Sequence, residues 1–252
     1  MADRLGGLRA LADREPLLLA LCTAAGPGSA ALLRGETTLA RRVAADARHH
    51  AADVIELVDG VLGDAGHGLA DVEVFALAIG PGSFTRLRVG LATVKGLAFG
   101  SARRAAPVST LAAMAEAARV HVGPGRPVAP ALDARRGQLY AALYAPVGEP
   151  AADGEAAPDW EARVPEGVYG VEEWLARLPA EAVVVGEGAA LCEGGPVECR
   201  ADWGAPAADA VGRLGARMAA RGEAVSPDAL VPRYLRRAEA ESLRLGLARP
   251  PA

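Results

Sequence analysis

Short apolar runs alternate with glycine-rich turns along the chain, and this pattern predicts an α/β protein. A run of five or six apolar residues indicates a strand covered on both faces, because such a strand needs no alternation of apolar and polar side chains. Three runs of this kind are Leu17–Cys22, Val74–Ile79 and Val128–Leu132. The second leads into Gly80-Pro81-Gly82, which ends the strand in a tight turn.

A helix is predicted directly after this turn, from Phe84 to about Gly100, with Ser83 at the capping position. Five apolar residues follow helical spacing and form one stripe: Phe84, Leu87, Leu91, Val94 and Ala98. Three more apolar residues lie off that stripe: Val89, Leu97 and Phe99. The helix is therefore expected to be covered on two sides. Either a partner or a second copy provides the second cover, or the helix lies inside one large core.

A second helix with a broad apolar side is predicted to begin at Asp46 or Arg48 and to end near Gly63. Its apolar side contains Val54, Ile55, Leu57, Val58, Val61 and Leu62, while Asp53, Glu56 and Asp59 occupy much of the rest. A side of that width predicts a contact beyond a single sheet.

The opening pattern of strand, turn and returning strand occurs twice. Leu17–Leu21 and Ser29–Leu33 form the first unit, and Val128–Leu132 and Gln138–Tyr144 form the second. We therefore expect two related domains, residues 16–122 and residues 123–252, with a C-terminal segment that packs back. Residues 1–15 are predicted to be a mobile extension, and Gly148–Pro165 is predicted to be a surface loop because it is rich in Ala, Pro, Asp and Glu.

Composition excludes several classes of function. The 252 residues carry a net charge of −4 with no long basic stripe, so strong independent binding to nucleic acid is not expected. Three cysteines without a C-x-x-C motif, and four histidines without an H-x-x-x-H motif, predict neither a disulfide framework nor a metal site. No run is apolar and long enough to cross a membrane, and no secretory signal is visible, so we expect a cytoplasmic protein.

The glycine turn matches none of the common catalytic or nucleotide-binding motifs. It lacks the Gly-Lys-Ser/Thr of a phosphate loop, the third glycine of a dinucleotide fingerprint and the G-x-S-x-G of a hydrolase elbow. A purely structural turn and an anion site both remain open.

The run GPGSFTRLRVGLATVKGLAFG, residues 80–100, is very similar to the signature of the TsaB (YeaZ) family of bacterial tRNA threonylcarbamoyladenosine biosynthesis proteins. Four further segments agree with the family in the same order: residues 48–50, 107–111, 132–140 and 232–236. The resemblance covers about Leu17 to Arg237 and is weakest between Ala145 and Gly204.

The resemblance implies an actin-like ATPase (ASKHA) fold, with two similar domains that each contain a mixed sheet flanked by helices. It implies a non-catalytic subunit that binds and activates a TsaD-like transferase, is joined by a TsaE-like ATPase, meets tRNA only through the complex and forms a homodimer when alone. No cofactor is expected, and a nucleotide at the partner interface stays open. The expected contact residues are Arg48, Val54, Leu57, Val58, Val61, Leu87, Gly90, Leu91 and Val94.

Two departures from the family pattern bear on chemistry. Cys22 stands where the family usually has the aspartate that, in ATP-using relatives, helps to hold a metal-bound phosphate. Arg86 stands where glycine is common. Asp133 lies at the matching turn of the second unit, either as a surviving acid or as a capping residue of the turn. The alternatives to a partner subunit are an ATP-dependent kinase or hydrolase of the actin-like fold and, third, a peptidase.

Overall fold

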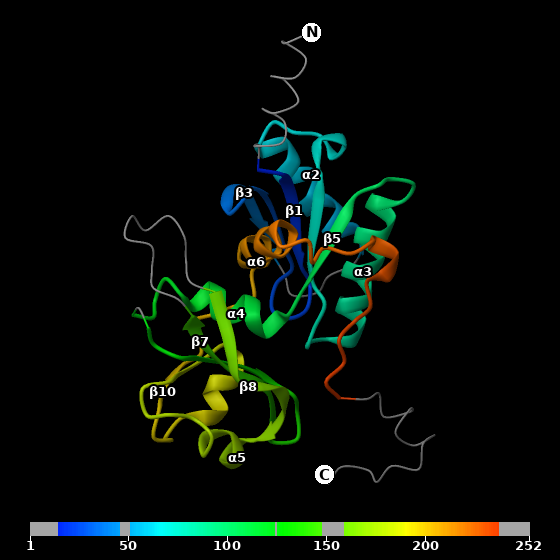
Figure 1. Cartoon of the computed structure of the whole chain (residues 1–252). Helices are drawn as coiled ribbons and strands as arrows, with labels where there is room; N and C mark the ends of the chain where they lie inside the picture. The colour runs from blue at the N-terminus through cyan, green and yellow to red at the C-terminus, as the bar shows by residue number, and fades with distance from the viewer. Residues whose placement is uncertain (1–14, 46–50, 124, 148–158, 237–252) are drawn as a thin grey trace.

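Two five-stranded mixed sheets, one above the other in Figure 1, make up the protein. The computed structural model describes residues 15–45, 51–123, 125–147 and 159–236. The strands of the first sheet are β1 (Leu17–Cys22), β2 (Ser29–Arg34), β3 (Thr37–Val43), β4 (Val74–Ala78) and β5 (Arg104–Val108). Their order is β3-β2-β1-β4-β5, with β1, β4 and β5 parallel and β2 and β3 antiparallel to their neighbours.

The second sheet repeats this arrangement. Its strands are β6 (Val128–Asp133), β7 (Gln138–Val147), β8 (Asp159–Gly170), β9 (Val183–Val185) and β10 (Glu198–Arg200). The order β8-β7-β6-β9-β10 has the same pattern of antiparallel and parallel pairs as the first sheet. The predicted duplication is confirmed, and Cys22 and Asp133 end the two equivalent central strands.

One predicted loop is wrong in part. Residues 159–165, expected at the surface as a loop, form the first half of β8, which pairs with β7 through most of its length. This strand is polar and half-exposed, so its sequence does not show the apolar run that marks the inner strands. The earlier part of the predicted loop, residues 148–158, lies outside the described residues.

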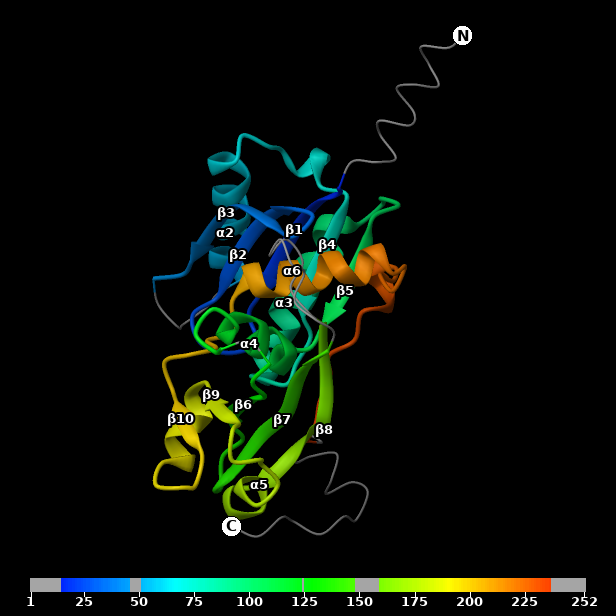
Figure 2. The same cartoon turned by 60° about the vertical axis from the view of Figure 1, so that its left-hand side comes forward.

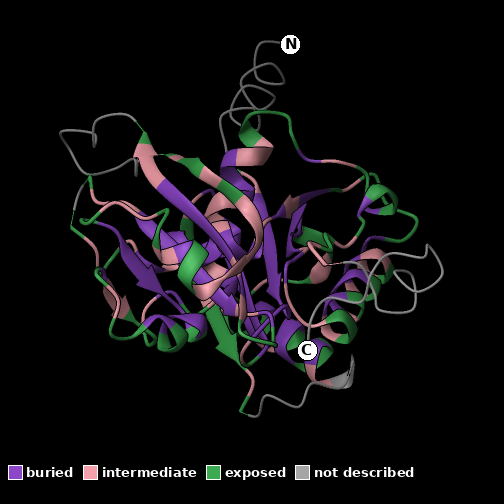
Figure 3. Cartoon of the chain, turned by 90° about the horizontal axis from the view of Figure 1, so that it is seen from below, coloured by how far each residue is buried: buried purple, intermediate pink, exposed green. Residues whose placement is uncertain are grey.

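Helices cover both faces of the first sheet. α2 (Ala51–Asp64) and α3 (Phe84–Ala98) lie on one face, and α6 (Ala208–Ala220) crosses the other, as Figure 2 shows. α6 packs so closely on the strands that a Cβ added at Gly215 would lie 2.5 Å from the Cβ of Ala76. Figure 3 shows the result, with the buried residues concentrated in the two sheets and on the sides of the helices that face them.

Two helices cross the predicted boundary between residues 122 and 123. α4 (Thr110–Ala118) precedes the boundary, yet Leu111 and Met114 pack in the core of the second sheet with Val128 and Val185. α6 follows the second sheet in sequence and returns to cover the first. α5 (Val171–Leu175) covers the other face of the second sheet. The remaining short helices are η1 (Leu69–Asp71), η2 (Glu187–Cys192) and η3 (Pro227–Ala229).

The chain ends with a segment that joins the two halves, which we call the C-terminal strap, residues 230–236. Leu230 is buried in the first core, and Leu235 packs against the second. The backbone N–H of Arg233 donates to the carbonyl of Ile79 at 2.7 Å. In Figure 1 the strap descends along α3 toward the lower half. The strap thus contacts both halves of the molecule.

Candidate functional site

A cleft of about 370 Å³ lies between the two halves, at the ends of the two central strands. It is lined by Ala24, Ala25, Gly26, Gly82, Ser83, Arg86, Leu132, Asp133, Ala134, Arg135, Tyr140 and Glu187. The turn after β1 and the start of α3 form one wall, and the β6–β7 turn forms the other. The chemistry of these residues decides whether the cleft can be a catalytic site.

Cys22, at the end of β1, is a buried and neutral side chain. Its side chain is completely buried. Burial is the main reason that the pKa of its thiol is raised, to about 12, so the group is neutral at pH 7. A carboxylate at the same position would bring a negative charge to a metal-bound phosphate, and this side chain does not.

The Asp133 carboxylate makes its hydrogen bonds within its own turn. One carboxylate oxygen accepts a hydrogen bond of 2.7 Å from the backbone N–H of Arg135, and the other lies 3.3 Å from the Arg135 guanidinium. This is the capping arrangement that aspartate adopts in turns. It favours the structural interpretation of Asp133 over that of a surviving catalytic acid.

Arg86 ties α3 to the turn after β1. Its guanidinium donates to the carbonyl of Gly26 at 2.5 Å, and its backbone carbonyl accepts from the hydroxyl of Thr23 at 2.9 Å. Ser83 stands at the predicted capping position, but its hydroxyl makes no capping hydrogen bond. The family glycine at position 86 is therefore replaced by a side chain that holds the cleft wall in place.

The predicted contact residues of α2 and α3 face the protein's own core. Eight of the nine are buried: Val54, Leu57, Val58, Val61, Leu87, Gly90, Leu91 and Val94. Arg48 lies outside the described residues. The buried side chains pack between the helices and the first sheet, which satisfies the apolar stripes without a second subunit. In the chain alone these eight residues are therefore not exposed.

The outward stripes of α2 and α3 carry mostly small and charged side chains together with Ile55, and Phe99, directly after α3, is 89% exposed. Val89 and Leu97 are partly buried against the first core. The exposed residues of the two stripes are Ile55, Glu56, Asp59 and Gly63 on α2, and Thr85, Arg88, Ala92 and Gly96 on α3. Asp64 at the end of α2 and Phe84 at the start of α3 are exposed as well. The α2 stripe is acidic and the α3 stripe is basic. Small residues at Ala92 and Gly96 leave room for another chain to approach closely.

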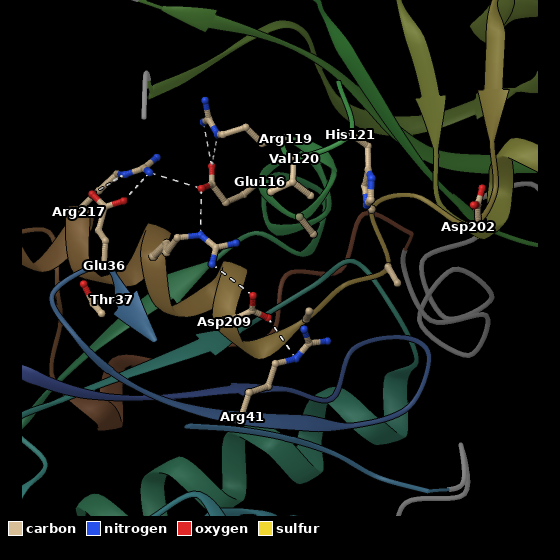
Figure 4. Close-up of a pocket in the computed structure, with 15 residues that line it drawn as sticks. Glu36, Thr37, Arg41, Glu116, Arg119, Val120, His121, Asp202, Asp209 and Arg217 are labelled. Carbon is tan, nitrogen blue, oxygen red and sulfur yellow. Dashed lines mark hydrogen bonds and ion pairs between the residues drawn. The ribbon is translucent and has the colours of Figure 1, made fainter. Parts of the chain in front are cut away.

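A second cavity, of about 640 Å³, lies beside α4 and α6 and was not predicted from the sequence. Figure 4 shows Glu116 at its centre, pointing toward arginines from α4 and α6. The Glu116 carboxylate accepts from Arg119 at 2.8 Å, from the Trp160 indole at 2.9 Å and from Arg213 at 3.2 Å. Arg217 lies 3.4 Å away. The network thus joins α4, α6 and β8.

The neighbouring arginine charges favour the ionised form of the Glu116 carboxylate. Burial alone would raise the pKa of Glu116, but the Arg119 and Arg217 charges and the hydrogen bonds outweigh it and hold the pKa below its usual value. Arg217 also makes a two-pronged pair with Glu36 of the β2–β3 turn, at 2.9 and 2.6 Å. Each arginine of the network thus meets a carboxylate.

The described ranges contain no group of three His, Cys, Asp or Glu residues placed to hold a metal ion. Across the same ranges, no helix has both the length and the hydropathy that a membrane crossing requires.

Two mixed sheets with the same strand order, each flanked by helices, define a protein of the actin-like (ASKHA-type) class. A family model described as TsaD, tRNA N6-adenosine threonylcarbamoyltransferase, matches residues 37–173. A crystal structure described as an uncharacterized protein with similarity to peptidase YEAZ from Pseudomonas aeruginosa has a TM-score of 0.75. It is 30% identical and covers 88% of this chain and 100% of that one.

Two relatives carry the name tRNA threonylcarbamoyladenosine biosynthesis protein TsaB. The Escherichia coli protein is 33% identical over 75% of this chain and 81% of its own length. The Haemophilus influenzae protein is 41% identical over 49% of this chain and 51% of its own length, so the chain spans about half of that relative. The chain belongs to the TsaB (YeaZ) family.

Proposed function

We propose that this protein is a non-catalytic subunit of a tRNA threonylcarbamoyladenosine modification complex and that it binds and activates a TsaD-like transferase. The relation to the E. coli TsaB protein, over four fifths of that protein's length, carries the proposal. The cleft adds support, because Cys22 is a buried neutral thiol and Asp133 is bound within its own turn. The apolar stripes of α2 and α3 do not support the proposal, because they are buried in the protein's own core.

The outward stripes of α2 and α3 form the docking face in this proposal. Acidic α2 and basic α3 lie side by side, and an antiparallel copy of the same face would place each charge opposite its complement. The same face can therefore serve a homodimer when the chain is alone and a TsaD-like subunit when it is present. A TsaE-like ATPase would join that complex through a surface that we do not assign.

Ala92→Arg tests the docking face. The side chain at residue 92 points outward from α3, so the variant folds, but the long side chain blocks close approach of another helix. We expect affinity for the cognate TsaD-like subunit to fall at least about tenfold, which corresponds to about 1.4 kcal/mol. Binding is measured as mass in solution during titration of the purified subunits.

Ala220→Arg is the matched control, because Ala220 is exposed at the end of α6, on the opposite face of the same sheet. This variant is expected to bind as the wild type does. Normal binding by Ala92→Arg would show that the face is wrongly assigned. Failure of the wild-type chain to bind would overturn the proposed function itself.

A further inference from the structure

One edge of the molecule carries arginines whose partners are all neutral. The Arg88 guanidinium lies 3.8 Å from the centre of the Phe84 ring, and its Nε donates to the hydroxyl of Tyr234 at 3.2 Å. Arg236 donates to the carbonyl of Ala134 at 2.6 Å. Its second donor bonds the side-chain amide oxygen of Gln138. The C-terminal strap therefore holds these cations between the start of α3 and the β6–β7 turn.

Arg86 extends this edge into the cleft, where it meets only the carbonyl of Gly26. Among the described residues, no carboxylate lies within ion-pair distance of Arg86, Arg88 or Arg236, whereas each arginine around Glu116 has one. α3 contains no acidic residue at all. The edge therefore presents positive charge that the fold itself does not neutralise.

The β6–β7 turn places a fourth arginine beside these three. Arg135 and Arg136 have φ angles of 67° and 59°, a region that costs a non-glycine residue energy and that asparagine or glycine enters more easily. The Arg135 side chain is 86% exposed and pairs only with Asp133 of the same turn. Arginine at a strained and exposed position points to a role for the side chain rather than for the backbone.

We propose that the basic edge outside the docking face, Arg86, Arg135 and Arg236, contacts the sugar–phosphate backbone of the RNA that the complex modifies. The inference rests on the proposed function. Planar guanidinium groups bind phosphate through two parallel hydrogen bonds. Phe84 and Tyr234, stacked with centroids 5.2 Å apart and 43% and 39% exposed, add a surface on which an unpaired base can stack.

The net charge of −4 fits a supporting contact rather than independent capture of RNA. The basic edge attracts a phosphate backbone locally, although the chain as a whole is acidic. An acidic protein surface is the competing partner for the same cations. The stacked, partly exposed rings of Phe84 and Tyr234 favour RNA over that alternative.

The double variant R135N/R236Q tests the proposal. Asparagine accepts the left-handed turn, and glutamine can still donate to the carbonyl of Ala134, so the fold is preserved. Both positions lie off the docking face. In a complex of the full chain with the cognate TsaD-like subunit, we expect tRNA binding to weaken about tenfold or more at 0.1 M salt. The slope of log affinity against log salt should fall by about two.

R163Q/R177Q is the matched control, because it also removes two exposed arginines from the second half of the molecule, where they pair with Glu161 and Glu173. Its tRNA affinity and salt slope should equal those of the wild type. An unchanged slope in R135N/R236Q, with the complex intact, overturns the inference. Weaker assembly of R135N/R236Q with the TsaD-like subunit also overturns it, because the cations would then serve protein docking.

A wild-type chain that forms no complex would instead refute the proposed function. The inference about the basic edge is then tested by measuring tRNA binding to the chain alone at low salt. There, R135N/R236Q must bind tRNA more weakly than R163Q/R177Q, and equal binding overturns the inference.

Discussion

Two glycines of α3 have opposite consequences, although the sequence suggests the same role for both. Gly90 faces the strands, where a Cβ would press on the Thr23 hydroxyl and lie 3.0 Å from a methyl of Leu77. Gly96 faces open space, with nothing within 4 Å of an added Cβ. The sequence shows that another group comes close to this helix. It does not show that the group at Gly90 belongs to the same chain.

Gly90→Ala is therefore expected to lower the free energy of unfolding by about 1–3 kcal/mol, because the added methyl overpacks the core. Gly96→Ala is expected to raise it by about 1 kcal/mol, because alanine is the better helix former and meets no obstacle. Urea denaturation of the purified variants measures both. Equal changes in the two variants would contradict the assignment of the inner and outer sides of α3.

At the scale of elements, the Glu116 network determines how α4, α6 and β8 meet. Sequence alone could not reveal it, since Glu116 and Arg217 are 101 residues apart and an acid within an alanine-rich helix is usually at the surface. The strands were easier to predict. Apolar runs identified β1, β4 and β6, whereas the polar edge strand β8 lacked that signal and was predicted as loop.

Glu116→Gln is expected to destabilise the protein by about 3 kcal/mol at pH 7, because the variant leaves buried arginine charge without its counterion. The folded pKa of Glu116 lies below its ordinary value of 4.5. The stabilisation is therefore complete above pH 4.5 and is lost as the pH falls through the folded pKa. The free energy of unfolding, measured from pH 7 to pH 3, should fall in the wild type as Glu116 takes up a proton. This contribution to the fall should be absent in the variant.

Glu173→Gln provides the comparison, because its pair with Arg177 is half-exposed. A cost below about 1 kcal/mol is expected there. Equal costs at the two positions would mean that the network contributes no more than a surface ion pair.

At the scale of the whole molecule, the two halves exchange helices. α4 follows the first sheet but packs on the second, and α6 follows the second sheet but packs on the first. The duplicated strands could be predicted, because both units show the same order of strand, turn and strand. The exchange could not, because a helical stripe shows that a face is buried but not which sheet buries it.

A fragment of residues 15–122 is therefore expected not to fold, because one face of its sheet would lose the cover of α6. Circular dichroism should show no cooperative thermal transition for this fragment, whereas the chain of residues 15–236 should show one. A cooperative transition in the short fragment would mean that the first half is independent of α6.

The position of α6 also matters while the protein is being made. β5 completes the first sheet at Val108, but the helix that shields this sheet ends 112 residues later, at Ala220. At about 5–20 residues per second, a ribosome needs on the order of ten seconds to synthesise that interval. During this time the nascent chain exposes the alanine- and leucine-rich side of its first sheet, so newborn copies must be kept apart until α6 has been synthesised.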